Sequence, residues 1–199
     1  MEQMKKSYTS TEQITARCGM YRLLSRLWIR ELDLELLRAL CSPPLRDLFT
    51  AAGGKTPDGD DEAVKEQLAM DYCRLFVGPA NHLPPFQAVW QTGQFQGKTT
   101  VSMSSFVDVV GYNTQLLPAG MMLDHLGVQL DVMGHILGQA LIRQSKEDGL
   151  DEVLEVSDAF FARHLQWPTR LLQTAIPRAT TDFYRSLIQV TRDFLQSES

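Results

Sequence analysis

Paired cysteines are absent from this sequence. The three cysteines, Cys18, Cys41 and Cys73, lie far apart, and no two of them form a CxxC pair. An odd number of widely spaced cysteines does not make a disulfide framework. The pattern predicts three reduced thiols in a reducing compartment.

An excess of positive charge is also lacking. The chain has 19 lysine and arginine residues against 24 aspartate and glutamate residues, which gives a formal net charge of −5 at pH 7. Proteins that bind nucleic acids present clusters of lysine and arginine to the phosphates, so we expect no nucleic-acid partner. A negative surface favours a basic partner, although only weakly.

Long hydrophobic runs are missing as well. A membrane-spanning helix needs about 20 consecutive apolar residues, and charged residues interrupt every shorter run here. The first residues, MEQMKKSYTSTEQ, contain two lysines but no apolar stretch after them, so they do not resemble a secretory signal. We therefore expect a cytoplasmic protein with no membrane span.

The common enzyme motifs GxGxxG, GxxxxGK[ST], HExxH and GxSxG do not occur. Asp131 and His135 are one helical turn apart, so they could share a metal ion in a small metal-dependent enzyme together with Asp124 and His125. A solvent-facing pair at this spacing is much more common than a metal site. The prediction is therefore a protein that is not an enzyme, with no metal or catalytic residues.

What the sequence does contain is helical periodicity. Apolar residues recur at spacings of three and four, as in Ile14, Cys18, Tyr21 and Leu24, and this places them on one face of a helix. Ser10 or Thr11 is a candidate N-cap for that helix. The same reasoning predicts helices near residues 14–28, 34–40, 61–77, 100–112, 121–146, 150–165, 168–176 and 181–195, with a further short one before 52. No convincing strand pattern occurs, so we expect an all-α fold, a single bundle of about eight to ten helices.

The segment between residues 80 and 98 has no periodicity and is rich in proline, glycine, glutamine and aromatic residues. It predicts a long ordered loop, and such loops are commonly functional. Phe86 and Trp90 follow the pair Pro84 and Pro85, which holds the backbone extended. The aromatic rings suit an apolar peptide, but the residues alone favour the simpler interpretation, in which Phe86 and Trp90 plug the core.

A second unusual pair is Asp124 and His125, near the start of a predicted helix. Neighbours on a helix point about 100° apart, so these two do not form a catalytic pair. One interpretation is a capping aspartate next to a partly buried histidine. The functional alternative is a polar pair at the mouth of a groove, in which Asp124 offers negative charge to a basic peptide.

Five segments in order resemble the TorD/DmsD family of redox-enzyme maturation chaperones, most closely its DmsD-type members. They are RLFVGP (Arg74–Pro79), LPPFQAVW (Leu83–Trp90), DHLGVQLDVM (Asp124–Met133), HLQWP (His164–Pro168) and DFYRSLIQVTRDFL (Asp182–Leu195). The resemblance covers nearly the whole chain after about Ile14.

This resemblance implies an all-α fold with a larger N-terminal part, residues 1–112, a connection at 113–120, and a smaller C-terminal part, 121–199. It implies that the protein binds the twin-arginine signal peptide of a molybdopterin-containing reductase of the dimethyl sulfoxide or trimethylamine N-oxide type, and delays export until the cofactor is inserted. The family's ligand contacts correspond here to Leu75, Phe76, Pro85, Phe86, Trp90, Asp124 and His125.

The resemblance also implies either a monomer or a domain-exchanged dimer, since the connection at 113–120 could act as a hinge. Some relatives bind guanine nucleotide weakly, but no phosphate-binding loop in this sequence supports that property. We expect no resident cofactor. The third alternative to the chaperone and the enzyme is a helical scaffold protein with a different partner.

Overall fold

The computed structural model describes residues 10–95, 97–144 and 149–199, and within them the fold is all-α as predicted. These residues form ten α-helices and no strand; a single isolated bridge pairs Phe86 with His125. The α-helices are α2 (Thr11–Trp28), α3 (Leu34–Leu40), α4 (Leu45–Ala51), α5 (Glu62–Tyr72), α6 (Gln87–Thr92), α7 (Lys98–Val109), α8 (Leu126–Gln144), α9 (Leu150–His164), α10 (Thr169–Ala175) and α11 (Asp182–Ser197). Three shorter turns are η2 (Cys73–Val77), η3 (Thr114–Leu116) and η4 (Ile176–Arg178).

The chain divides into two compact units that are discontinuous in sequence. Unit 1 comprises the described parts of residues 1–29, 86–88 and 92–166, and unit 2 comprises 30–85, 89–91 and 167–199. The continuous division at 113–120 that the family resemblance implies stays a prediction. Residues on both sides of that connection, α7 before it and α8 after it, belong to unit 1.

The first helix begins where the sequence predicts it. The Ser10 hydroxyl accepts from the Gln13 backbone N–H, and the Gln13 side chain accepts from the Ser10 backbone N–H, which forms a capping box. The periodic apolar side chains of α2, including Ile14 and Tyr21, are fully buried. The spacing of three and four is therefore the pattern of a helix that packs one face against a neighbour.

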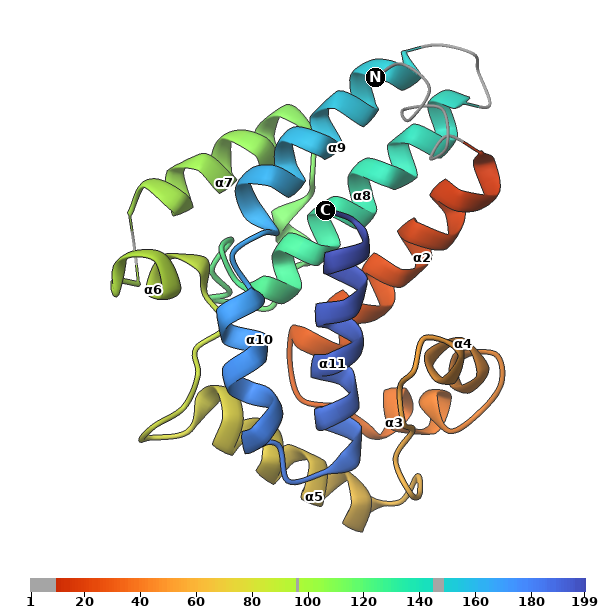
Figure 1. The fold of residues 1–199 in the computed structure, drawn as a ribbon, viewed down its shortest axis with the longest axis vertical. Helices are drawn as coiled ribbons and strands as arrows, with labels where there is room; N and C mark the ends of the chain where they lie inside the picture. The colour runs from red at the N-terminus through yellow and green to blue at the C-terminus, as the bar shows by residue number, and fades with distance from the viewer. Residues whose placement is uncertain (1–9, 96, 145–148) are drawn as a thin grey trace. The chain divides into compact units, whose positions relative to one another are not determined.

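Glycines let α2 approach α8 closely in unit 1, where α2, α8 and α9 lie side by side (Figure 1). A Cβ atom on Gly127 would lie 2.8 Å from the backbone nitrogen of Ile29. About two turns further along α8, the Gly134 carbonyl accepts a hydrogen bond from the Cys18 Sγ at 3.2 Å. The antiparallel pair α2 and α8 is thus in contact through backbone as well as side chains.

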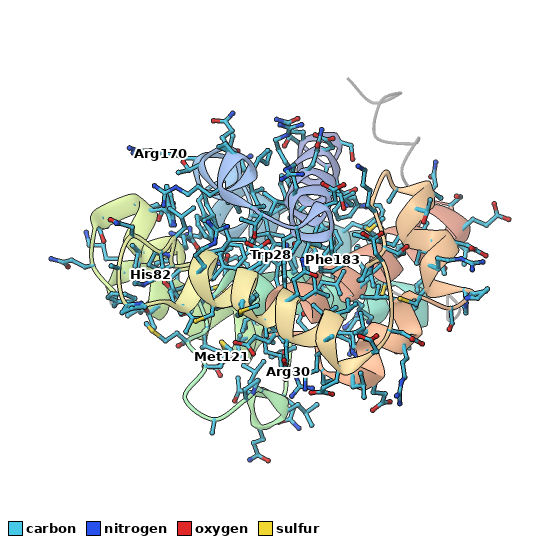
Figure 2. All side chains as sticks on the ribbon, turned by 90° about the horizontal axis from the view of Figure 1, so that it is seen from below. Trp28, Arg30, His82, Met121, Arg170 and Phe183 are labelled. Carbon is cyan, nitrogen blue, oxygen red and sulfur yellow. The ribbon has the colours of Figure 1, made fainter. Side chains whose placement is uncertain are left out.

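A buried carboxylate joins the helices of unit 2. Asp71 on α5 is 2% exposed and accepts from the backbone N–H groups of Thr180 and Thr181, just before α11 begins. It also accepts from the Thr181 hydroxyl at 2.7 Å and from Arg74 at 2.8 Å. Burial alone would raise the pKa of Asp71, but hydrogen bonds from Arg74, Thr181 and Thr180 lower it. Figure 2 shows Phe183, from the first turn of α11, in the crowded interior of this unit, and Arg170 of α10 at its edge.

Three local features differ from the sequence predictions. Residues 87–92 form the short helix α6 inside the segment predicted to be a loop. The helix predicted over 61–77 continues only to Tyr72 as α-helix, and then becomes a π-helical turn, η2. The helix predicted from 121 begins at Leu126, and its predicted end at Lys146 lies outside the described residues, as does the N-terminal segment 1–9.

Across 10–95, 97–144 and 149–199, the helices fall short of the length and apolar character that crossing a bilayer demands.

We predict that Gly127→Ala destabilises the protein by about 1–3 kcal/mol, because the new methyl group meets the rigid backbone of Ile29. Gly138→Ala is the matched control on the same helix. Its Cβ would lie 2.9 Å from the Arg22 Nη2 atom, which is the end of a flexible side chain that can move away. Urea unfolding should show a clear loss for the first variant and little change or a gain for the second. Equal losses would contradict this account of α2–α8 packing.

Removing the Asp71 carboxylate should be more costly. Asp71→Ala leaves two backbone N–H groups without their acceptor and Arg74 without its ion-pair partner, so we expect a loss of about 3 kcal/mol or more in unfolding free energy. Asp193→Ala, which removes an exposed carboxylate paired with Arg192, is the control and should change stability by about 0.5 kcal/mol or less. Thermal melts followed by circular dichroism compare the two.

Candidate functional site

The predicted contacts Leu75 and Phe76 lie in the π-helical turn η2 of unit 2. The turn is closed by a hydrogen bond from the Gly78 N–H to the Cys73 carbonyl at 2.6 Å, which spans five residues. Leu75 is 2% exposed and Phe76 is 4% exposed, so both side chains are part of the core of unit 2. π-Helical turns are rare and occur often at functional sites.

The π-helical turn also fixes the start of the proline loop. The Leu75 carbonyl accepts from the Leu83 N–H at 2.7 Å. The Phe76 ring packs edge-on against Tyr72, with ring centres 5.4 Å apart. Leu75 and Phe76 therefore hold the backbone that leads into the aromatic segment, and their side chains face inward.

Pro85 and Trp90, also in unit 2, differ in exposure. Pro85 is buried, whereas Trp90 is half-buried. The Trp90 indole N–H donates to the Pro84 carbonyl at 2.8 Å. This hydrogen bond satisfies the polar edge of the ring and holds it in one orientation, so that part of its apolar surface stays accessible.

Phe86 belongs to unit 1 and forms a small aromatic cluster there. Its half-buried ring lies edge-on to His125, with ring centres 5.1 Å apart, and to Phe95, at 5.8 Å. Phe95 is 53% exposed. Sequence reasoning did not select Phe95; the signal was an aromatic residue among the glycines and glutamines of the same segment.

Asp124 is fully buried in unit 1, at 0% exposure. Its Oδ2 accepts from the Ala88 N–H at 3.0 Å, and its backbone carbonyl accepts from the Gln87 N–H at 3.0 Å. Asp124 thus caps the first turn of α6, which corresponds to the capping interpretation, although the helix it caps is not the one that follows it in sequence. The carboxylate is enclosed within unit 1, and a direct peptide contact by Asp124 stays a prediction.

Burial raises the pKa of the Asp124 carboxyl, and the backbone hydrogen bonds from Ala88 and within Asp124 oppose that shift. Its Oδ1 has no hydrogen-bond partner among the described residues. A carboxylate in this position carries a desolvation cost that only part of its hydrogen bonding offsets.

His125 is 3% exposed, and its Nδ1 accepts from the Gly127 N–H at 3.0 Å. The neutral ring therefore carries its proton on Nε2. Burial lowers the pKa of His125 to about 4, so the ring is uncharged at neutral pH. It serves as an apolar platform for Phe86.

A buried network of polar side chains fixes the segment between Phe86 and Ala88. The Gln87 side-chain oxygen accepts from Gln129 Nε2 at 2.6 Å and from His164 Nδ1 at 2.9 Å, while its nitrogen donates to the Arg163 carbonyl at 2.8 Å. These partners lie on α8 and α9. Gln87, Gln129 and His164 are each 2% exposed or less.

The network defines the protonation of His164. The Arg163 carbonyl can only accept, which sets the orientation of the Gln87 amide; its oxygen then requires a proton on His164 Nδ1. The other ring nitrogen, Nε2, accepts from the Ser102 hydroxyl at 3.0 Å. Burial, helped by the nearby charge of Arg163, lowers the pKa of His164 to about 4. The sequence analysis did not single out this network, because its members are separated by up to 77 residues.

The pair considered as metal ligands has other partners. The Asp131 carboxylate accepts from the Tyr112 hydroxyl at 2.5 Å, and His135 Nε2 lies 3.0 Å from the Val110 carbonyl oxygen, to which it donates. These contacts join the residues that follow α7 to α8. No group of three or more potential metal ligands occurs among the described residues.

Comparisons with known proteins now identify the class. The family model of the nitrate reductase delta subunit matches residues 35–173 of this chain. The chaperone protein YcdY of Escherichia coli is 30% identical over 66% of this chain and 62% of its own length, and the chaperone protein TorD of Shewanella sp. strain ANA-3 is 32% identical over 61% and 66%. These two matches span slightly less than two thirds of each relative.

A longer match is the chaperone protein TorD of Shewanella loihica, which is 26% identical over 94% of this chain and 93% of its own length. Among solved structures, a candidate redox enzyme maturation protein from Archaeoglobus fulgidus has a TM-score of 0.51 over 90% of this chain and 93% of that chain, at 15% sequence identity. That likeness concerns the fold alone.

The described residues have an all-α fold, and the relatives that the chain matches are named chaperones. The chain belongs to the nitrate reductase delta subunit family, which includes the TorD-type chaperones, and the resemblance seen in the sequence is confirmed. The narrower likeness to the DmsD-type members stays a prediction.

The lowered pKa values of the buried His125 and His164 predict how the unfolding free energy changes with pH under acidic conditions. Their pKa values are about 4 in the folded protein and about 6.5 in the unfolded chain, so the unfolded chain binds more protons between these values. Their stabilising contribution is therefore complete above pH 6.5 and is lost as the pH falls toward 4, at up to about 1.4 kcal/mol per pH unit for each ring.

We expect His164→Gln to make the unfolding free energy less dependent on pH between 6.5 and 4 than in the unmodified protein. Urea titrations at several pH values measure this slope. The raised pKa of Asp124 changes the unfolding free energy with pH in the opposite direction. This effect is present in both proteins, so it cancels when their pH profiles are compared. Parallel pH profiles for the two proteins would show that His164 is not held neutral.

Proposed function

We propose that this protein is a cytoplasmic chaperone that binds the twin-arginine signal peptide of a molybdopterin-containing reductase and delays export until the cofactor is inserted. The observation that carries the proposal is the similarity to a TorD chaperone along 94% of this chain and 93% of the relative. The client would be a reductase of the dimethyl sulfoxide or trimethylamine N-oxide type.

The candidate residues divide by burial into two groups with different roles in this proposal. Phe86 and Trp90 are half-buried and would contact the peptide through their ring surfaces. The other five are buried and would position the segment that carries the two rings; they are Leu75, Phe76, Pro85, Asp124 and His125. Each aromatic contact would contribute about 1–2 kcal/mol by removing apolar surface from water.

A signal peptide supplies suitable surfaces for this mode of binding. Its basic first part is followed by an apolar stretch that can form a helix, and helical proteins commonly accept such helices on apolar surfaces. An exposed ion pair contributes little affinity, so the arginines of the peptide would mainly set orientation and association rate.

In this proposal the protein acts by binding rather than by catalysis. The relatives named above are chaperones, and the pair Asp131 and His135, offered as metal ligands, is used to join α7 to α8. No resident cofactor is required, and both a monomer and a domain-exchanged dimer are compatible with the proposed contacts.

The direct test is calorimetric titration of the purified chain with synthetic twin-arginine signal peptides from every molybdopterin-containing reductase of the source genome. Saturable binding of at least one peptide, with no binding of its scrambled version, is expected. If none of the peptides binds, the proposed function is wrong.

We predict that Trp90→Ala lowers the affinity for the bound signal peptide by about 5- to 30-fold, the equivalent of about 1–2 kcal/mol, without unfolding the chain. Trp167→Ala is the matched control, since Trp167 is also a half-buried tryptophan of unit 2. It should leave peptide affinity unchanged. Collapse of the fold in the Trp90 variant, seen in a circular dichroism melt, would instead favour the core-plug interpretation.

A further inference from the structure

One face of α5 and the turn η2 is exposed and apolar in unit 2. Met70 is 67% exposed and Val77 is 59% exposed, although the opposite face of the same segment is buried. The buried side chains of this segment are Leu68, Asp71, Tyr72, Leu75 and Phe76. Figure 2 presents α5, drawn in gold, toward the viewer.

The N-terminal end of this face is strongly acidic. Residues 58–66 contain five acidic side chains and one lysine, in a chain whose net charge is −5. This short segment therefore holds most of the excess negative charge of the chain. All five acidic residues are exposed; they are Asp58, Asp60, Asp61, Glu62 and Glu66. The rest of the chain is close to neutral.

Several carboxylates converge on the single lysine. The Lys65 ammonium forms an ion pair with Glu62. This hydrogen bond raises the pKa of Lys65, desolvation opposes the rise, and the charges of Glu62, Glu66 and Glu31 add smaller increases. One ammonium group cannot neutralise three carboxylates. The surface around Lys65 therefore keeps a negative potential that favours a second, external cation.

Helix capping explains only part of this acidity. The Asp61 carboxylate caps α5 by accepting from the Val64 N–H at 3.0 Å, and Glu62 lies in the first turn, where the helix dipole favours negative charge. Glu66 is in the second turn, beyond the region where that effect is appreciable. Neither effect explains the exposed Met70 that follows it.

Arg74 lies between the two exposed apolar residues Met70 and Val77, and a buried carboxylate neutralises its charge. The Arg74 side chain is 51% exposed, forms an ion pair with Asp71 at 2.8 Å, and donates to the Arg178 carbonyl. The order along the segment is therefore the acidic end, Met70, the ion pair of Arg74 with Asp71, and Val77. Glu62 and Met70 are eight residues apart, which corresponds to about 12 Å along the axis.

We propose that this face seats the leader segment of the client, with its basic residues over Glu62 and Glu66 and its following apolar residues over Met70 and Val77. This inference rests on the proposed function and adds a docking surface to it. Charge complementarity sets the direction, because the exposed acidic residues that attract the basic part of the leader lie at only one end of the segment, at 58–66. Methionine suits such a surface, since its flexible side chain adapts to different apolar partners.

The test uses the signal peptide that binds best to the full chain, in its natural form and in a form with its basic residues replaced by glutamine. Four proteins are titrated: the unmodified chain, the double variant Glu62→Gln/Glu66→Gln, Met70→Ser, and the control Glu155→Gln/Asp158→Asn. The control removes two exposed carboxylates of α9 in unit 1 and matches the change in net charge.

We expect the Glu62/Glu66 double variant to weaken binding of the natural peptide about three- to tenfold at low salt, and less at high salt. It should bind the neutralised peptide no more weakly than the unmodified chain does. Met70→Ser should weaken both peptides about fivefold, and the control should change neither by as much as twofold.

The failure of this inference is distinguishable from failure of the proposed function. If the natural peptide binds the unmodified chain and all variants equally, the leader binds elsewhere and the docking surface is wrong, while the chaperone function stands. If the Glu155/Asp158 control weakens binding as much as the Glu62/Glu66 variant, only net charge matters and the docking surface is again wrong. If no signal peptide binds the unmodified chain, both proposals fail.

Discussion

The buried side-chain amide of Gln87 holds three elements of unit 1 together. Its oxygen accepts from α8 and α9 and its nitrogen donates to a backbone carbonyl at the end of α9, while the residue is only 2% exposed. A buried polar group of this kind is costly unless it is satisfied, so each partner must keep its place. The position of the aromatic segment depends on this constraint.

Several other properties of unit 1 follow from the buried hydrogen bonds of Gln87. The segment 86–88 belongs to unit 1, while the residues on both sides of it belong to unit 2. The hydrogen bonds of Gln87 and Asp124 connect this segment to the rest of unit 1. His164 is kept neutral and in one tautomer because Gln87 needs its proton. Phe86, the next residue in the chain, rests on the neutral ring of His125. An uncharged histidine is a suitable neighbour for a ring whose exposed side is proposed to meet an apolar peptide.

The residues that carry the family resemblance have different roles in the structure. Asp71, Arg74 and the residues just before α11 are joined by hydrogen bonds in unit 2, which gives Arg74, the first residue of the RLFVGP segment, a structural role. Trp90 and Phe86 keep part of their rings accessible, which suits them to binding. A motif match thus identifies the class of protein, and burial separates residues that build the fold from those able to touch a partner.

The sequence by itself determined the all-α class, the bounds of most helices and the membership of the family. Apolar spacing of three and four is a local property, and so are caps such as Ser10, so both can be read without knowing the neighbours. The tertiary structure alone decided the burial of Asp124, the network around Gln87, the helix α6 and the discontinuous units. These depend on contacts between residues far apart in the chain: Asp124 and Ala88 are 36 positions apart, and Gln87 and His164 are 77. No local pattern encodes such pairs, because the energy of a buried polar group is set by whichever partner the fold brings to it.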